Sequence, residues 1–329
     1  MINRRILIFG LVAILGISIV KLGTNMISDN LSSIDDEIEI IRSDEQDMEI
    51  VEDEDMRKTV FYFKNDKDYL VPVMKPIPWE EGIAKTVLMN MVEGAEFGKS
   101  LEELGLKPIL PAGTDLKGIS VDEETGLCKA DFSEEIQDIE SDEDEENLIK
   151  GVVYTLTEFP NIEEVQIMVD GKVIPRLNNT YAIDKPLNRE DINLIGEADD
   201  GSSKVVVYYK GETEEDEDYF VPVTIPTSAP VSNVYTALDL LFDGPPEDSG
   251  LKTDIPNEIS LQAVEVKEGT AFVDVNLQDG SELSEEDAVN EVLKNVGLTL
   301  SEFEEVETVE LLLDGEIVNT TVPVFVNEY

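Results

Sequence analysis

Short β-rich runs and amphipathic segments alternate along the chain from residue 58 onward. Val60–Phe63 and Tyr69–Met74 flank a polar stretch, which predicts a β-hairpin. Trp79–Val92 carries apolar residues at helical spacing, which predicts an amphipathic helix that stops at Gly94. The first part of the chain is therefore expected to run strand, strand, helix.

The same kinds of pattern continue to residue 174. We expect a second hairpin, a helix with apolar positions 148, 152, 156 and 159, a strand, a type I′ turn at Asp170-Gly171 and a last short strand. Ser133 or Asp131 is the expected cap of the element after the second hairpin. The expected strands here are Ile119–Val121, Leu127–Phe132, Val165–Val169 and Lys172–Ile174.

The chain then repeats itself. Tyr154–Gly171 is similar to Leu298–Gly315 at an offset of 144 residues (315 − 171), and Asp68–Val73 is similar to Asp218–Val223 at an offset of 150 (218 − 68). A period of this length is that of a whole domain, well above the periods of solenoids. The elements expected in the second copy are Val205–Tyr209, Tyr219–Val223, Val231–Phe242, Ser260–Val266, Ala271–Val275, Ala288–Phe303, Val309–Leu313 and Ile317–Val318.

Each copy is predicted to be an α+β domain with a mixed β-sheet and two helices in the order ββαββαββ, after an N-terminal apolar helix. The predicted organisation is a signal or membrane anchor at 1–27, an acidic disordered tether at 28–57, a first domain at 58–196, a linker at 197–203 and a second domain at 204–329. Each copy has its own strands and amphipathic helices, so we expect each to fold alone.

The N-terminal apolar run is Ile6–Val20, with Arg5 before it and Lys21 after it. It is short for a spanning helix, but it lacks a typical cleavage site and a cysteine that could carry lipid. We therefore favour an uncleaved anchor over a cleaved signal peptide. Under both readings the domains lie outside the cytoplasm, because the positive end of such a segment stays inside.

The chain of 329 residues carries 74 Asp and Glu against 24 Lys and Arg, a net charge of −50. This charge repels nucleic acid, so no nucleic-acid partner is expected. The acidic residues extend over both copies, and such self-repulsion is tolerated best where salt screens it. We therefore expect a protein adapted to high salt.

The composition also excludes several kinds of catalytic site. The chain has no histidine, which removes histidine-based triads and imidazole metal ligands, and its one cysteine, Cys128, cannot form an intramolecular disulfide. Cys128 lies in an alternating apolar run and is expected to be buried and inert. No catalytic, cofactor-binding or metal-binding residue is predicted, because acidic residues are too common for one pair to be singled out.

Three further features have structural interpretations. The acidic run 134–147 lacks the spacing of a calcium loop, so it is expected to be a solvated loop, although cation binding there stays open. The motif Thr155, Glu158, Phe159 recurs as Thr299, Glu302, Phe303, with the phenylalanines expected in the core and the threonine or the glutamate at the surface. Pro72 and Pro222 predict edge strands, because proline cannot donate to a ladder.

Several of these motifs resemble the GerMN domain of the GerM family of sporulation and spore-germination proteins. The motifs are Tyr-Leu-Val-Pro (69–72), Ala-Asp-Phe-Ser (130–133), Tyr-Thr-Leu-Thr-Glu-Phe-Pro (154–160) and Val-Asp-Gly (169–171), with Tyr-Phe-Val-Pro (219–222), Phe-Asp-Gly-Pro (242–245) and Thr-Leu-Ser-Glu-Phe (299–303) in the second copy. The resemblance covers about four fifths of the chain. The missing lipid-attachment cysteine and the acidic composition depart from the family pattern.

The resemblance implies a non-enzymatic envelope protein that helps to assemble or localise protein complexes in sporulation or germination. Its expected partners are envelope or sporulation proteins, with peptidoglycan as a further candidate, and the membrane through Ile6–Val20. A cell-wall binding module is the alternative, followed by a carboxylate-based cell-wall hydrolase.

Overall fold

The computed structural model describes residues 38–39, 56–78, 82–178, 180–196, 201–212, 218–277, 286–318 and 326–328. The predicted anchor Ile6–Val20 and most of the predicted tether lie outside these residues. In the part of the chain that is described, no helix is long and apolar enough to cross a membrane.

The first repeat has one helix more than expected. Its elements in order are β2 (Met56–Lys64), β3 (Leu70–Pro78), α2 (Ile83–Asn90), α3 (Glu96–Leu101), the 3₁₀ turn η1 (Glu102–Leu104), β4 (Leu116–Asp122), β5 (Leu127–Phe132), the 3₁₀ turn η2 (Glu134–Gln137), α4 (Asp142–Thr157) and β6 (Glu164–Val169). The strand predicted at Lys172–Ile174 does not form, so the order ββαββαββ does not hold for this repeat.

The second repeat lacks a counterpart of α3 among its described residues. Its elements are β7 (Ser203–Glu212), β8 (Asp218–Thr227), α5 (Val234–Asp243), β9 (Ile259–Lys267), β10 (Thr270–Leu277), α6 (Glu286–Leu300), β11 (Thr308–Leu313) and the two-residue β12 (Glu316–Ile317). A further short strand, β1 (Ile38–Glu39), lies within the range predicted as tether and pairs with β11.

The strands of each repeat form two sheets instead of the single sheet that was expected. The hairpins β2–β3 and β7–β8 are separate two-stranded sheets, while β4-β5-β6 and β9-β10-β11 form the larger ones. In both larger sheets the first pair is antiparallel and the second is parallel, so these sheets are mixed. The helix before β6 or β11 provides the crossover that a parallel pair requires.

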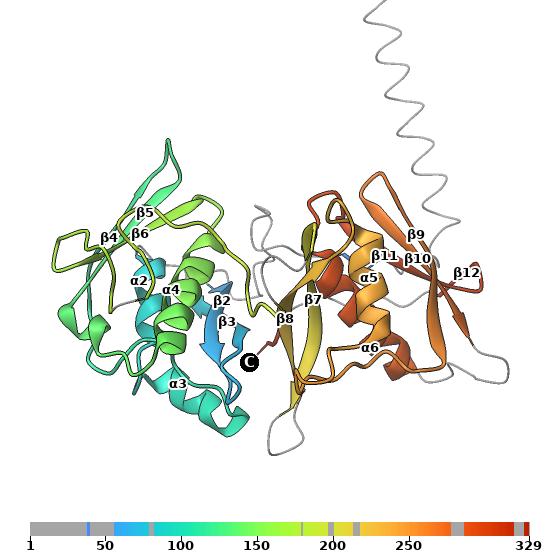
Figure 1. Ribbon diagram of the computed structural model, residues 1–329, viewed down its shortest axis with the longest axis horizontal. Coiled ribbons are helices and arrows are strands. Elements are labelled where there is room, and N and C mark those ends of the chain that lie inside the picture. The colour runs from blue at the N-terminus through green and yellow to red at the C-terminus, as the bar shows by residue number, and fades with distance from the viewer. Residues whose placement is uncertain are drawn as a thin grey trace, which may run out of the picture.

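Each repeat is built in three layers (Figure 1). The helices lie between the hairpin on one side and the three-stranded sheet on the other, and α4 accordingly contacts both β2 and β6. Because both sides of α4 are covered, it buries ten residues from Glu145 to Leu156, more than one amphipathic stripe would. The two hairpins face one another at the centre of the molecule, and β3 contacts β8.

Most of the residues predicted for the core are confirmed there. Ile83, Val87 and Met91 are buried, although α2 ends at Asn90 before the predicted stop at Gly94. Phe159 and Phe303 are buried as expected. Cys128 is fully buried on β5, and burial raises the pKa of its thiol to about 12, which keeps it protonated and inert.

The turn at Asp170-Gly171 forms, with φ of 49° and 74°, but no strand follows it. Pro175 comes soon after and has no N–H to donate, and the outer edge of β6 is paired with Leu187 instead. The segment 180–187 therefore occupies the place where a last strand was predicted, and we call it the strap of the first repeat.

The predicted cap is confirmed in position only, and the predicted acidic loop is corrected. Ser133 occupies the N-cap position of η2, the element that follows the second hairpin, but its side chain makes no capping bond there. The Oγ of Ser141 accepts from the N–H of Asp144 and caps α4, while the Oγ of Ser133 accepts from the N–H of Asp115. Residues 142–147 form the first turns of α4, where carboxylates are stabilised by the helix dipole. Glu145 is fully buried and accepts from the N–H groups of Asn178 and Thr180, so this part of the run is not a solvated loop.

Candidate functional site

The repeats meet at an interface formed by the edges of their hairpins. The Oδ1 of Asn193 accepts from the N–H of Leu70, and its Nδ2 donates to the carbonyls of Leu70 and Pro222, all at 2.7 Å. Asn193 thus binds a strand of its own repeat and a strand of the other. The prediction that Pro72 and Pro222 lie in edge strands is confirmed, but the two edges face each other.

Asn327 makes the same contacts from the second repeat. Its Oδ1 accepts from the N–H of Phe220 at 2.6 Å, and its Nδ2 donates to the carbonyls of Phe220 and Pro72 at 2.8 and 2.7 Å. Backbone bonds add to both sides, from Met74 N–H to the Asn327 carbonyl and from Thr224 N–H to the Ile192 carbonyl. The junction is therefore approximately two-fold symmetric.

A tyrosine of each hairpin is bound to the helix behind it. The N–H and OH of Tyr62 contact Thr155 Oγ1 and Glu158 Oε1, both at 3.3 Å. Tyr208 contacts Thr299 Oγ1 at 3.2 Å and Glu302 Oε1 at 3.0 Å. The repeated motif therefore has a structural role: both threonines are fully buried, and of the two alternatives expected at the surface only the glutamate is found there, exposed at Glu302 and half-buried at Glu158.

One arginine connects these groups electrostatically. Arg189 forms an ion pair with Glu158 at 2.5 Å and lies over the ring of Tyr154, 4.9 Å from its centroid. Burial alone would lower the pKa of Arg189. The negative charge of Glu158, together with a smaller contribution from Glu302 of the other repeat, outweighs burial, so the pKa is raised. Arg189 therefore stabilises carboxylates of both repeats.

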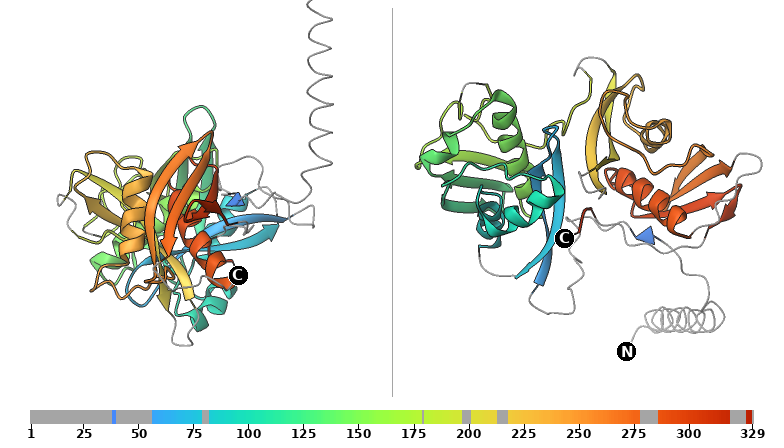
Figure 2. Two further views of the ribbon diagram at one scale, coloured as in Figure 1. Left: turned by 90° about the vertical axis from the view of Figure 1, so that its right-hand side faces the viewer. Right: turned by 90° about the horizontal axis from the view of Figure 1, so that it is seen from below.

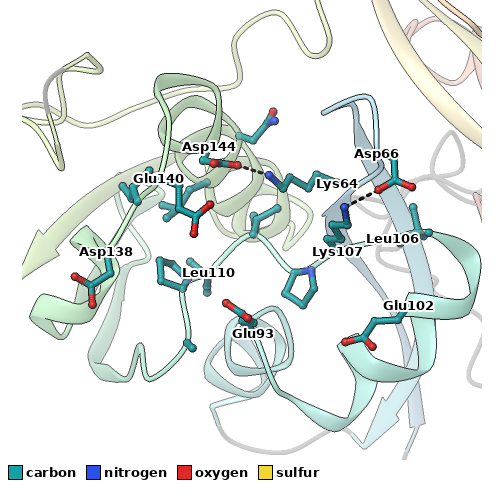
Figure 3. Close-up of a pocket in the computed structure, with 18 residues that line it drawn as sticks. Lys64, Asp66, Glu93, Glu102, Leu106, Lys107, Leu110, Asp138, Glu140 and Asp144 are labelled. Atoms are coloured by element: carbon teal, nitrogen blue, oxygen red, sulfur yellow. Dashed lines mark hydrogen bonds and ion pairs between the residues drawn. The ribbon is translucent and has the colours of Figure 1, made fainter.

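The first repeat also has an open groove of about 750 Å³ (Figure 3). It lies between the β2–β3 turn, the start of α4 and the extended segment that follows η1. Its wall includes the apolar side chains of that segment, among which Leu106 and Leu110 are buried. The groove is thus partly apolar, and its rim carries charged side chains.

The two lysines of the groove are already paired. Lys107 contacts Asp66 at 2.6 Å, and Lys64 pairs with Asp144 and Asp68 (Figure 3). Burial alone would lower the pKa of Lys64, but the hydrogen bond that its ammonium donates to Asp144 has the opposite effect. The net result is a raised pKa. Four exposed carboxylates of the rim have no ion pair among the described residues: Glu93, Glu102, Asp138 and Glu140. The rim is therefore locally anionic.

The lysine of the second repeat that corresponds to Lys64 is also enclosed by carboxylates. Lys210 corresponds to Lys64 and pairs with Asp254, Glu291 and Asp218. Its buried ammonium is thus part of a closed charge network. The paired lysine is therefore a structural feature of both repeats, and the groove described above lies in the first repeat, beside its extra helix α3.

The carboxylates of the acidic run 134–147 do not gather at one place. Its residues are divided between η2, the groove rim and α4, and no group of three potential ligands lies together among the described residues. The sequence predicted no catalytic or cofactor-binding residue, and that prediction stays untested.

The comparisons with known proteins agree on a family. Residues 59–175 and 206–319 match the family described as "Germane: Sporulation and spore germination". The chain is 31% identical over 276 residues to the spore germination protein GerM of Bacillus subtilis (strain 168), covering 80% of this chain and 73% of that protein. This chain belongs to the Germane family.

The solved tandem GerMN domains of the sporulation protein GerM from Bacillus subtilis have the same architecture. They match with a TM-score of 0.68 and 27% identity, over 83% of this chain and 99% of that one. The predicted family membership and the tandem α+β organisation are therefore confirmed. Both relatives are described by sporulation or germination, and this supports a role for the present chain in the same process.

The sequence did not predict the two asparagines that connect the repeats at the junction. Asn193 and Asn327 are 134 positions apart (327 − 193), outside the range of offsets from 144 to 150 that relates the other elements. Their neighbours differ as well, Ile-Asn-Leu against Val-Asn-Glu, so no repeat pattern marks them. The repetition of Tyr62 as Tyr208 was visible, but not that each hydroxyl would bind a glutamate of the recurring motif.

Proposed function

We propose that this chain is a non-enzymatic, membrane-anchored protein outside the cytoplasm that assembles or localises envelope protein complexes in sporulation or spore germination. The observation that supports this best is the paired asparagine junction, because it holds two similar domains in one fixed arrangement. A fixed pair can present two partners to each other at high effective concentration without any chemistry.

The groove of the first repeat is the partner surface that we assign. Its occupant would be an extended segment of another protein that carries lysine or arginine beside apolar residues. The four unpaired rim carboxylates complement such cations, and the half-exposed apolar side chains of Pro108, Pro111 and Ile139 complement the side chains between them. Helix α3, which lies beside the groove, has no counterpart among the described residues of the second repeat, so the two repeats offer different surfaces to a partner.

A charge-neutralising variant tests this surface in the organism's own sporulation. Glu93, Glu102, Asp138 and Glu140 are changed together to the corresponding amides and compared with a control that neutralises four other exposed carboxylates: Glu123, Glu124, Glu247 and Asp248. Both variants change the net charge equally. We expect the groove variant to lose its normal localisation and the formation of heat-resistant spores, and the control to keep both.

Two other results would contradict the proposal. Normal sporulation and germination after deletion of the whole gene would reject the family-based function for this chain. Incubation with purified peptidoglycan tests the alternatives: released fragments would indicate a hydrolase, and co-sedimentation without release would indicate a wall-binding module. We expect neither.

A further inference from the structure

The outer edge of the larger sheet is covered in the first repeat by the chain's own strap. The N–H of Val165 on β6 donates to the carbonyl of Leu187 at 2.9 Å, and the N–H of Leu187 donates back at 2.8 Å. These two bonds form an antiparallel bridge. The strap thus satisfies backbone groups that an open edge would leave unpaired.

The equivalent residue of the second repeat is Val309 on β11, 144 positions after Val165 (309 − 165). It also has an antiparallel partner, but that partner comes from the other end of the chain. Ile38 of β1 is paired with Val309, and Glu39 with Thr308 (Figure 2). The same edge position is therefore filled twice, by Leu187 in one repeat and by Ile38 in the other.

The second repeat has too short a connection to make its own strap. Asn193 lies 22 positions after Gly171 (193 − 171), but Asn327 lies only 12 positions after Gly315 (327 − 315). Both asparagines reach equivalent places at the junction. The second repeat thus arrives there with ten residues fewer, and the first repeat uses its longer connection for the strap.

We infer that the N-terminal segment around Ile38–Glu39 serves as the strap of the second repeat, and that the β11 edge is a binding surface for this extended segment. Backbone pairing supplies the attachment, as in other cases of strand addition. Within the range predicted as a simple tether, Ile38–Glu39 is therefore a structural part of the second domain. This inference depends on strand pairing and is independent of the proposed partner and of the groove.

The strap also determines which repeat lies next to the membrane under the anchoring proposed above. Seventeen residues, 21–37 (37 − 20), connect Val20 to β1. Without the pairing of β1, the first fixed element after the anchor would be β2, which 35 residues, 21–55 (55 − 20), connect to Val20. Fully extended, these stretches reach at most about 60 Å and about 120 Å. Pairing with β11 therefore keeps the second repeat near the anchor, although the first repeat follows the anchor in sequence.

Hydrogen exchange of the full chain in detergent tests the strap with matched variants. Ile38→Pro removes an N–H from the paired segment, and Ser43→Pro makes the same change five residues further along. We expect Ile38→Pro to make exchange about tenfold faster in a peptide covering 306–312, which corresponds to about 1.4 kcal/mol. Ser43→Pro is expected to leave this peptide unchanged.

The first repeat supplies the reciprocal control. Leu187→Pro is expected to accelerate exchange in a peptide covering 162–168 and to leave 306–312 protected. A synthetic peptide of residues 30–46, added to the Ile38→Pro chain, should restore slow exchange at 306–312, whereas the same peptide with the proline should not. Equal exchange at 306–312 in the wild type and in Ile38→Pro would overturn the inference.

Discussion

Asn193 and Asn327 make the same three hydrogen bonds with the two repeats exchanged. Each side-chain amide binds the N–H and carbonyl of one strand residue, Leu70 or Phe220, and the carbonyl of the proline in the opposite strand. An amide can do this because it carries both a donor and an acceptor. The prolines have no N–H, so only their carbonyls need a partner here.

Replacing Asn327 with alanine is expected to destabilise the protein substantially. Three buried backbone groups would lose their partner, at a total cost of about 2–4 kcal/mol in the free energy of unfolding. Asn90→Ala is the matched control, because the Nδ2 of Asn90 donates only to the Thr86 carbonyl at a half-buried site. Denaturant unfolding of both variants measures the difference, and equal losses would contradict the role of the junction.

The junction changes the expectation that each repeat folds alone. Separation of 56–196 from 201–329 would expose β3 and β8 and leave each asparagine with one strand instead of two. We therefore expect one cooperative unfolding transition for the joined repeats and lower midpoints for both separate fragments. Calorimetry in high salt measures this. Fragments with midpoints equal to those of the joined chain would show that the repeats are independent.

The sequence predicted what depends on local pattern and failed where distant segments meet. Strands such as β5 and β6 follow from runs of apolar residues, and the Asp170-Gly171 turn follows from glycine's tolerance of positive φ. The division into two sheets does not follow, because the hairpin and the larger sheet have similar apolar faces and only the helices between them decide the layers. Glu145 is a clear example: nothing in an acidic run distinguishes the one carboxylate that is buried against the Asn178 and Thr180 amides.

The charge imbalance predicts a strong dependence of stability on salt. With 74 acidic and 24 basic residues, the folded chain concentrates a net charge of −50. The distance over which charges repel one another, the Debye length, falls from about 10 Å at 0.1 M salt to about 3 Å at 1 M. Because the repulsion between carboxylates is then weaker, NaCl should raise the thermal midpoint over this range. An increase that levels off near 1 M would indicate screening. An unchanged midpoint would contradict the expectation of adaptation to high salt.

The buried tyrosines predict a loss of stability at alkaline pH. Burial, followed by the charge of Glu158 for Tyr62 and of Glu302 for Tyr208, raises both pKa values well above the ordinary value of 10.0. The folded protein therefore keeps two protons that the unfolded chain releases above pH 10. Stability from these groups is complete below this pH and falls as the pH rises above it.

Phenylalanine variants separate this effect from general alkaline damage. Tyr62→Phe with Tyr208→Phe removes both titrating hydroxyls and their bonds to the glutamates, so this variant should be less stable at pH 8 but should lose less stability between pH 9 and pH 11. Tyr235→Phe, at a half-exposed position, should retain the wild-type slope. Unfolding free energies measured across this range at constant salt check the prediction. Tyr62 and Tyr208 can affect the pH dependence of stability only through ionisation of their hydroxyls, which the double variant lacks. If the double variant loses stability with pH as steeply as the wild type, other groups determine alkaline stability.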